Sequence, residues 1–418
     1  MNTSQIQITF LPNGWHILTS QPIKKRMRWG AENVPLSITP QTEANHPGSY
    51  TNMLAKNRED GSIKIGPLIG ILTMKGKTKP FRGNIRNFVD IIATAKKIGG
   101  LVFIFTPENI DWKHRQIHGY YLNQKGWSPV LFPFPDVVYN RIPYREEEQK
   151  PKAQLTLERL SNFPNLYLYN PHFFNKWTLF EWLKQFKTLP CSLPETAQIE
   201  TKNQLHDFLE TYQSIYLKPI RGKAGNGIIR IDKSNDHYLL KYQDKDIQHK
   251  KCKTLHEAWN LIQPYIRKQG YIIQQGVPLL TYQGNPFDCR VLVQKNGKGE
   301  WVVTGVGIRV AGRYGITTHV PRGGKIAKPH QVLKAAFHSD QYADLMRRIE
   351  ECALKMALHI EHHVATVGEM SMDLGISADG KLWFFEANAK PMKFDEPDIR
   401  QRSLIHIIQY AQYLSFFK

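Results

Sequence analysis

The sequence predicts a mixed fold in which a small N-terminal β module precedes an α/β domain and a larger α+β domain. Three observations predict it. The chain has 418 residues, 41% of them apolar and 11% aromatic, which is enough for more than one hydrophobic core. A strand–helix–strand pattern occupies residues 65–105, and after about residue 170 strands and helices mix without that alternation. No repeat of about 20 to 50 residues is visible, so a solenoid or propeller is not expected.

The N-terminal module is predicted from short alternating segments at residues 6–10 and 15–18, separated by Pro12-Asn13-Gly14. A polar stretch at residues 41–49 predicts a mobile link. We therefore assign residues 1–62 to a small β module and linker.

The next segment predicts a parallel sheet. Residues 65–72 and 101–105 are apolar runs typical of buried strands, and residues 84–98 place apolar side chains on one helical face. Strands at 127–134 and 136–140 complete an α/β domain, assigned to residues 63–170. The acidic run at 146–148 is expected to be solvated and to carry no site.

Residues 171–418 are assigned to the α+β domain. Helices are predicted at 176–186, 203–212 and 339–362, the last with a long apolar stripe. Strands are predicted at 214–218, 227–231, 271–277, 288–295 and 301–309.

The chain is basic, with 56 Lys and Arg residues against 36 Asp and Glu and a net charge of +20. Such a surface suits nucleic acid, nucleotide phosphate, a polyanionic envelope or an acidic substrate. Four widely spaced cysteines fit neither a disulfide scaffold nor a CxxC metal site, and no signal peptide or membrane-length apolar stretch is visible. We expect a soluble cytoplasmic protein without a transmembrane segment.

The most informative residues are Asp373, Glu386 and Asn388. Asp379-Gly380 predicts a two-residue hairpin turn, which would place Asp373 opposite Glu386 and put Asn388 on the same face. Two carboxylates held together in a partly buried site repel, so the arrangement calls for a cation such as Mg²⁺. The alternative is a solvent-facing strand with incidental polar residues.

A second candidate site is a glycine-rich loop that follows a strand ending at Lys218. Glycines allow backbone N–H groups to approach phosphate oxygens, and lysines add positive charge. A strand follows the loop, where a P-loop would have a helix, and a flexible turn is the alternative. The loop residues proposed to bind nucleotide are Gly222, Lys223, Gly225 and Gly227.

Further candidates follow in chain order. Lys176 starts a predicted helix and could contact the α-phosphate. Residues 271–278 form a strand and an extended edge suited to adenine, with Gln274, Gln275 and Val277 as contacts. Asp288 and Arg290 share a strand face, and the candidate phosphate clamps are Arg290, Arg309 and Arg322. His319 and Lys390 are expected to be structural or to face a substrate.

This order of motifs resembles the ATP-grasp superfamily over about residues 170–415, with the preceding α/β segment similar to its pre-grasp domain. The segments 136–143, 218–227 and 384–388 are most similar to the YheC/YheD family, which is associated with endospore coats. The sequence departs from this pattern twice. It has Gln274-Gln275 where many relatives have an acid, and the segment 317–321 precedes Arg322-Gly323-Gly324, where related ligases often have an asparagine.

The resemblance implies an ATP- and Mg²⁺-dependent carboxylate–amine ligase that acts through an acylphosphate, with an unidentified carboxylate substrate. Asp373, Glu386 and Asn388 would hold Mg²⁺, and Lys176 and Lys218 would bind phosphates. The resemblance also implies association with a spore coat or envelope, and it is compatible with a homodimer.

Two alternatives remain. The chain could be a spore coat-associated structural or nucleotide-binding protein without turnover. Nucleic-acid binding is not favoured, because no recognisable module accompanies the positive charge.

Overall fold

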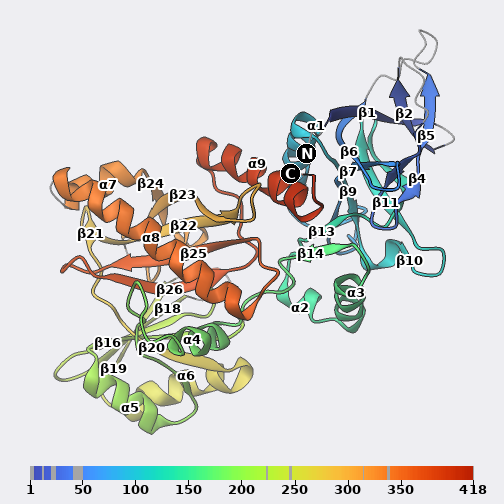
Figure 1. Ribbon diagram of the computed structural model, residues 1–418. Helices are drawn as coiled ribbons and strands as arrows, with labels where there is room; N and C mark the ends of the chain where they lie inside the picture. Colours follow the sequence, from blue (N-terminus) through green and yellow to red (C-terminus); the bar gives the residue numbers. More distant parts are fainter. Residues whose placement is uncertain are drawn as a thin grey trace.

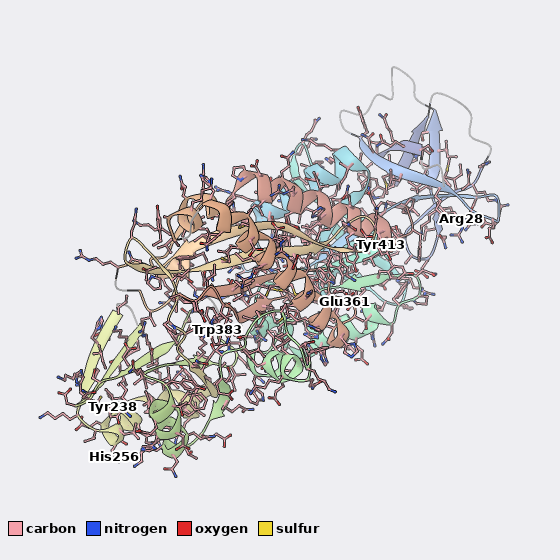
Figure 2. All side chains as sticks on the ribbon, turned by 60° about the vertical axis from the view of Figure 1, so that its left-hand side comes forward. Arg28, Tyr238, His256, Glu361, Trp383 and Tyr413 are labelled. Atoms are coloured by element: carbon pink, nitrogen blue, oxygen red, sulfur yellow. The ribbon has the colours of Figure 1, made fainter. Side chains whose placement is uncertain are left out.

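The computed structural model describes residues 4–11, 14–19, 25–40, 50–222, 225–243, 247–313, 315–336 and 339–417. The fold is built on four sheets, and along the molecule the fourth sheet lies between the second and the third (Figure 1). Arg28, on the first sheet, lies at one end, and Tyr238 and His256 lie at the opposite end (Figure 2). Trp383, on the fourth sheet, lies between these ends, so the candidate site belongs to the middle of the molecule.

The first sheet has the order β4-β3-β7-β6-β1-β2-β5 and confirms the predicted β module. The predicted strand 65–72 is divided, because residues 65–66 end β7 in this sheet and β8 begins the next one. The predicted link at 41–49 lies outside the described residues. The strands are β1 (Ser4–Leu11), β2 (Gly14–Thr19), β3 (Met27–Trp29), β4 (Val34–Pro35), β5 (Ser37–Pro40), β6 (Thr51–Asn57) and β7 (Ile63–Gly66).

The second sheet has the order β10-β11-β9-β8-β13-β14, with β12 beside β11. Strands β8, β9, β13 and β14 are parallel, as the strand–helix–strand pattern predicts. Helix α1 (Ile85–Ile98) begins after Asn84, whose side chain accepts the Asn87 N–H, and buries its apolar stripe on the sheet. The strands are β8 (Leu68–Leu72), β9 (Leu101–Phe105), β10 (Ile110–Asp111), β11 (Gln116–Asn123), β12 (Gly126–Pro133), β13 (Val137–Asn140) and β14 (Tyr167–Tyr169), and the 3₁₀ turn η2 spans Pro107–Asn109.

The acidic run at 146–148 is solvated only at Glu146, so the expectation of a solvated run is wrong for Glu147 and Glu148. It ends the short helix α2 (Arg145–Glu148), which precedes α3 (Pro151–Ser161). Glu147 is 8% exposed and pairs with Arg82, and Glu148 is 3% exposed and pairs with Lys390. Both partners are distant in sequence, so the run alone gives no sign that its charges are buried and paired.

The third sheet is antiparallel, with the order β15-β20-β16-β17-β18-β19, and α5 and α6 cover one face of it. The predicted helices near 176–186 and 203–212 are confirmed, whereas β18, β19 and α6 were not predicted. The elements are α4 (Lys176–Lys184), β15 (Thr196–Ile199), α5 (Lys202–Thr211), β16 (Ser214–Pro219), β17 (Ile229–Lys233), β18 (Tyr238–Gln243), β19 (Ile247–Cys252), α6 (Leu255–Gln269) and β20 (Tyr271–Gln275).

The fourth sheet has the order β24-β23-β22-β25-β26, with β21 beside β22. Helices α4, α7 and α8 pack on one face in the largest hydrophobic cluster. The opposite face carries alternate polar side chains and holds the candidate site. The elements are β21 (Thr281–Tyr282), β22 (Asn285–Lys295), β23 (Trp301–Val310), the 3₁₀ turn η3 (Val320–Arg322), β24 (Lys325–Ala327), α7 (Pro329–Ala336), α8 (Ser339–His363), β25 (Glu369–Ile376) and β26 (Leu382–Asn388).

The last helix, α9 (Pro397–Leu414), joins the α/β domain to the fourth sheet and was not predicted. Its apolar residues share a cluster with α1 and the second sheet (Figure 1). The Gln412 amide donates to the carbonyls of Ile98 and Gly99, where α1 ends. Among the described residues, no helix combines the length and apolar character that crossing a bilayer requires.

Candidate functional site

The β25–β26 hairpin brings the three predicted metal ligands together. Asp373 pairs with Glu386, and Asn388 lies two residues further along the same face. The predicted two-residue turn is wrong, because five residues, 377–381, connect the strands. A register shift beside Asp373 offsets the longer turn, so the predicted pairing of Asp373 with Glu386 is confirmed.

Positive side chains from three other elements contact these carboxylates. Lys176, the first residue of α4, pairs with Glu386 through its Nζ atom. Arg309 on β23 places Nη2 2.8 Å from Asp373 Oδ2, and Arg290 on β22 places Nη1 3.5 Å from Asp373 Oδ1. The predicted cations therefore do gather at the predicted acidic group.

Arg309 is buried beneath the site and is held by two carboxylates. Its Nε and Nη2 atoms donate to the two oxygens of Asp288 at 2.9 and 2.7 Å, in addition to the contact with Asp373. Thr318 donates its hydroxyl to the same Asp288 at 2.5 Å. Since bidentate pairs of this kind fix geometry, Arg309 is placed to position Asp373.

The environment shifts the pKa values of the two carboxyl groups, Asp373 and Glu386, in opposite directions. Burial raises the pKa of Asp373, although Arg309 and Arg290 oppose the change. Burial also opposes ionisation of Glu386, but the Lys176 ammonium and the His319 imidazole outweigh it and hold that pKa well below its ordinary value. The amide of Asn388 donates to Glu386 Oε1 at 3.1 Å. Carboxylate oxygens of Asp373 and Glu386 thus lie close together, with the Asn388 amide beside them, an arrangement that suits a divalent cation.

Lys218 lies at the end of β16, close to this group. Its Nζ atom donates to the Gln274 side chain at 2.5 Å, and Gln274 in turn donates to Thr196 at 2.9 Å. Burial, and then the nearby charge of Lys176, lower the pKa of Lys218 to about 8. A lysine that is poorly solvated and next to another cation is suited to binding an anion such as phosphate. The sequence assigned Gln274 to adenine, whereas the structure places its amide against Lys218.

In the glycine-rich loop, Gly225 and Gly227 adopt left-handed backbone conformations and lie close to neighbouring side chains. Gly225 and Gly227 have φ values of +76° and +71°, which side chains rarely adopt. A Cβ atom at Gly227 would lie 2.9 Å from the Pro219 ring, and one at Gly225 would lie 3.4 Å from His319 Nδ1. Gly222 donates its N–H to Pro219 at 3.1 Å. Lys223 lies outside the described residues.

The remaining predicted nucleotide contacts are Gln275, Val277 and Arg322. Strand β20 ends at Gln275, whose side-chain oxygen accepts the Glu195 N–H at 3.2 Å, and half-buried Val277 follows beyond the strand. Arg322 ends η3 and packs beside Gly225. These residues remain predictions as nucleotide contacts.

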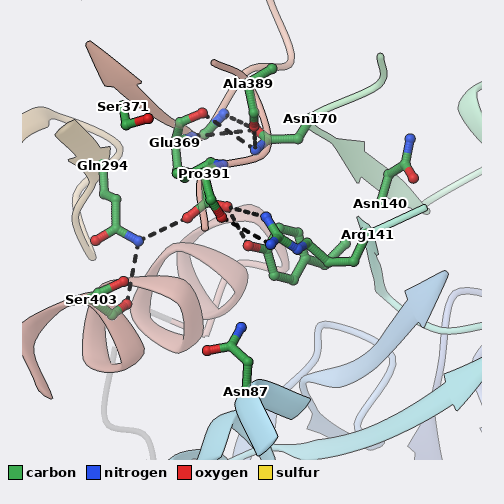
Figure 3. A network of polar contacts seen from close by, with 12 residues as sticks. Asn87, Asn140, Arg141, Asn170, Gln294, Glu369, Ser371, Ala389, Pro391 and Ser403 are labelled. Atoms are coloured by element: carbon green, nitrogen blue, oxygen red, sulfur yellow. Dashed lines mark hydrogen bonds and ion pairs between the residues drawn. The ribbon is translucent and has the colours of Figure 1, made fainter. Parts of the chain in front are cut away.

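A second polar network fixes the chain that follows Asn388 (Figure 3). Arg141 donates to Glu369 at 3.2 Å and to the Pro391 carbonyl at 2.9 Å, and Asn170 donates to the Ala389 carbonyl at 2.5 Å. Gln294 donates to the other oxygen of Glu369 at 3.0 Å. Because Arg141 and Asn170 belong to the preceding segment, the α/β domain helps to set the position of the β25–β26 hairpin.

Sequence reasoning missed two parts of the site. Glu369 precedes Asp373 by four residues on the same strand, and its alternation with Ser371 and Asp373 was the available signal. His319 was expected to be structural or substrate-facing, yet a ring nitrogen lies with carboxylate oxygens of Asp373 and Glu386 in a group whose atoms are all within 4.8 Å.

Comparison with known proteins gives the relatives of this chain. It is 29% identical over 369 residues to the endospore coat-associated protein YheD of Bacillus subtilis, covering 85% of this chain and 80% of YheD. It is 24% identical over 298 residues to the endospore coat-associated protein YheC of the same organism, covering 70% of this chain and 81% of YheC. Among solved structures, the VanG D-Ala:D-Ser ligase from Enterococcus faecalis matches with a TM-score of 0.49 and 13% identity, covering 84% of this chain and 99% of that one.

The model of the YheC/D-like ATP-grasp family matches residues 165–414. This range contains the third and fourth sheets and the described residues that contact Asp373 and Glu386. The chain belongs to the YheC/D-like ATP-grasp family.

Proposed function

We propose that this protein is an ATP- and Mg²⁺-dependent carboxylate–amine ligase that works through an acylphosphate. One observation carries the proposal. Asp373, Glu386 and Asn388 share one face of the β25–β26 hairpin, and two cations from other elements contact their carboxylates. Lys176 on α4 contacts Glu386, and Arg290 on β22 contacts Asp373. Acyl transfer through phosphate requires such positioning and charge stabilisation, and it requires no side-chain nucleophile.

The charge pattern of the site fits a metal–triphosphate complex. Four cations, Lys176, Lys218, Arg290 and Arg309, accompany the carboxylates of Asp288, Asp373 and Glu386. Lys176 pairs directly with Glu386, so it occupies the position that a divalent cation would take. With the cation bound, Lys176 would be released to pair with phosphate. When bound, Mg²⁺ would neutralise charge that develops on the phosphate oxygens.

The proposed reaction has two steps. A carboxylate oxygen of the substrate attacks the γ-phosphorus of ATP, the bond to ADP breaks, and Arg290 stabilises charge on the transferred group. The amine nitrogen of the second substrate then attacks the acyl carbon, phosphate leaves, and the amine loses its proton to solvent. Lys176 and Lys218 hold the phosphates through both steps.

The substrate is expected along the same face of β25. Ser371 and Glu369 continue that face from Asp373, and Ser371 accepts a hydrogen bond from Arg290 at 3.1 Å. A small pocket next to Glu369 is lined by Arg141, Lys393, Arg400 and exposed Met392, among others. Arg141 and Arg400 already pair with carboxylates of the protein. Within the described part of the chain, Lys393 has only a contact of 3.9 Å with Asp395, so we expect it to be the lining residue that meets a substrate carboxylate.

Spore association is the finer part of the proposal. Two relatives are named endospore coat-associated, and this chain carries far more positive charge than the site uses. We propose that part of the excess faces an anionic substrate or a spore surface.

The test is ADP release from the purified protein, screened with Mg²⁺-ATP against pools of amino acids, peptides and peptidoglycan-like carboxylates. Stimulation by one pool, lost in the Glu386→Gln/Asn388→Ala double variant, is expected. Asp207→Asn is the control, because Asp207 on α5 has a side chain that is 75% exposed and lies in neither the carboxylate group nor this pocket. Turnover that survives in the double variant would overturn the assigned metal site. Mg²⁺-dependent ATP binding with no phosphate release against any pool would favour the structural alternative.

A further inference from the structure

His319 lies at the edge of the carboxylate group, beside Glu386. It directly precedes η3, in the segment that leads from β23 to β24. Its Nε2 atom is 3.9 Å from Glu386 Oε1, which is too far for a hydrogen bond. Its Nδ1 atom is buried and has no hydrogen-bond partner among the described residues. Among the described residues Nδ1 therefore has no partner, and Nε2 has only this long contact with Glu386, so each nitrogen can take a further partner.

The distances fit a shared ion. One ligand atom each from His319, Asp373 and Glu386 lies within 4.8 Å of the others. Two ligands of one ion, each at about 2.2 Å, can be no more than about 4.4 Å apart. A shift of a few tenths of an ångström would therefore allow the three side chains to bind one cation.

We propose that His319 Nε2 is a ligand of the divalent cation held by Asp373 and Glu386, and that the site consequently prefers Mn²⁺ or a similar first-row ion to Mg²⁺. An imidazole ligand suits first-row transition metals, whereas Mg²⁺ takes oxygen ligands. This inference rests on the proposed metal site and adds both a ligand and a metal preference to it.

Through its second ring nitrogen, His319 would also connect the bound metal to the glycine-rich loop. A metal-bound histidine normally donates its second ring N–H to an acceptor that fixes the ring. Here Nδ1 lies on the side of Gly225, where a Cβ atom would be only 3.4 Å away. Nδ1 is thus placed to donate to a phosphate or to a carbonyl of this loop once nucleotide is bound, and Gly225 leaves the space for it.

The test uses untagged, full-length protein and Mn²⁺ as the probe, with and without a non-hydrolysable ATP analogue. Pulsed electron paramagnetic resonance reports a directly bound nitrogen through its ¹⁴N modulation, and titration gives the Kd values for Mn²⁺ and, by competition, Mg²⁺. We expect an imidazole signal in the wild type. We expect His319→Asn to lose that signal and to reduce the preference for Mn²⁺ over Mg²⁺ about tenfold, since the amide replaces nitrogen with oxygen.

Val320→Ala is the matched control, because it changes the next residue, whose side chain is 43% exposed, and retains the imidazole. It should keep both the signal and the metal preference. Mn²⁺ that binds in the wild type, is lost in Asp373→Asn, and shows no imidazole signal with nucleotide present would overturn the role of His319 alone. The absence of any Mn²⁺ or Mg²⁺ binding that depends on Asp373 would overturn the metal site and the proposed function together.

Discussion

The depressed pKa of Lys218 predicts that ATP binding takes up a proton. Burial and the charge of Lys176 lower this pKa to about 8 from an ordinary 10.5. At about 1.36 kcal/mol for each pH unit, holding the ammonium form in the empty site costs about 3 kcal/mol. A phosphate next to Nζ favours the ammonium form and should return the pKa towards its ordinary value, so part of that free energy is recovered on binding.

The direction of the pH effect follows from this change. Below pH 8 most Lys218 is already charged, and binding is at full strength. Above pH 8 the free protein must first gain a proton, so the Kd for ATP should rise about tenfold between pH 7 and pH 9 if Lys218 remains fully charged in the complex. About half a proton should be taken up for each ATP bound at pH 8. The terminal phosphate, with a second pKa of about 6, is already ionised there.

Isothermal titration calorimetry in two buffers of different ionisation enthalpy measures both quantities. Lys218→Arg is the control, since a guanidinium keeps its charge at every pH in this range, and its Kd for ATP should change less than about twofold. A wild-type Kd that is constant from pH 7 to pH 9, with no proton uptake at pH 8, would refute the assignment of Lys218 to the phosphates.

Two further predictions concern the loop and the buried ion pair. Gly227→Ala should weaken ATP binding and lower the free energy of unfolding by about 1 to 2 kcal/mol, because φ is +71° and the new Cβ would lie 2.9 Å from Pro219. Gly61→Ala is the control, because φ at Gly61 is +78° but a Cβ atom there would have no neighbour within 4 Å. It should show only the backbone strain and leave ATP affinity unchanged. Equal ATP affinities in the two variants would contradict a role for the loop. Lys390→Met should destabilise the protein by about 3 to 5 kcal/mol in denaturant unfolding, because it leaves Glu148 buried without its partner. Adding Glu148→Gln should restore part of that loss, and a single variant as stable as the wild type would show that the pair is not needed.

The parts of the fold that the sequence could predict are those with a strong local pattern. The apolar face of α1 and the buried runs of β8 and β9 identify the parallel sheet without any knowledge of their partners. In contrast, β18 and β19 carry many polar residues, and α9 buries its apolar side chains against two different sheets. Such elements are stabilised by distant packing, which leaves little local signal.

In the candidate site, too, the sequence predicted local side-chain positions but not the contacts that depend on distant strands. Alternation along a strand was enough to put Asp373, Glu386 and Asn388 on one face, even though the turn between the strands was predicted incorrectly. Gln274 was assigned to adenine from the sequence, and its contact with Lys218 was not foreseen because that contact depends on how β20 pairs with β16. His319 sits in an irregular segment between β23 and β24, where no period indicates which way a side chain points.

In the proposed reaction, the site transfers the γ-phosphoryl group of ATP to a substrate carboxylate. Labelling the carboxylate oxygens of the stimulating substrate with ¹⁸O, and measuring the released phosphate by mass spectrometry, tests this transfer. An acylphosphate leaves one substrate oxygen on the phosphate, so we expect released phosphate that carries one ¹⁸O atom. ADP and phosphate formed without any ¹⁸O would mean that water attacks ATP instead, and would rule out the acylphosphate.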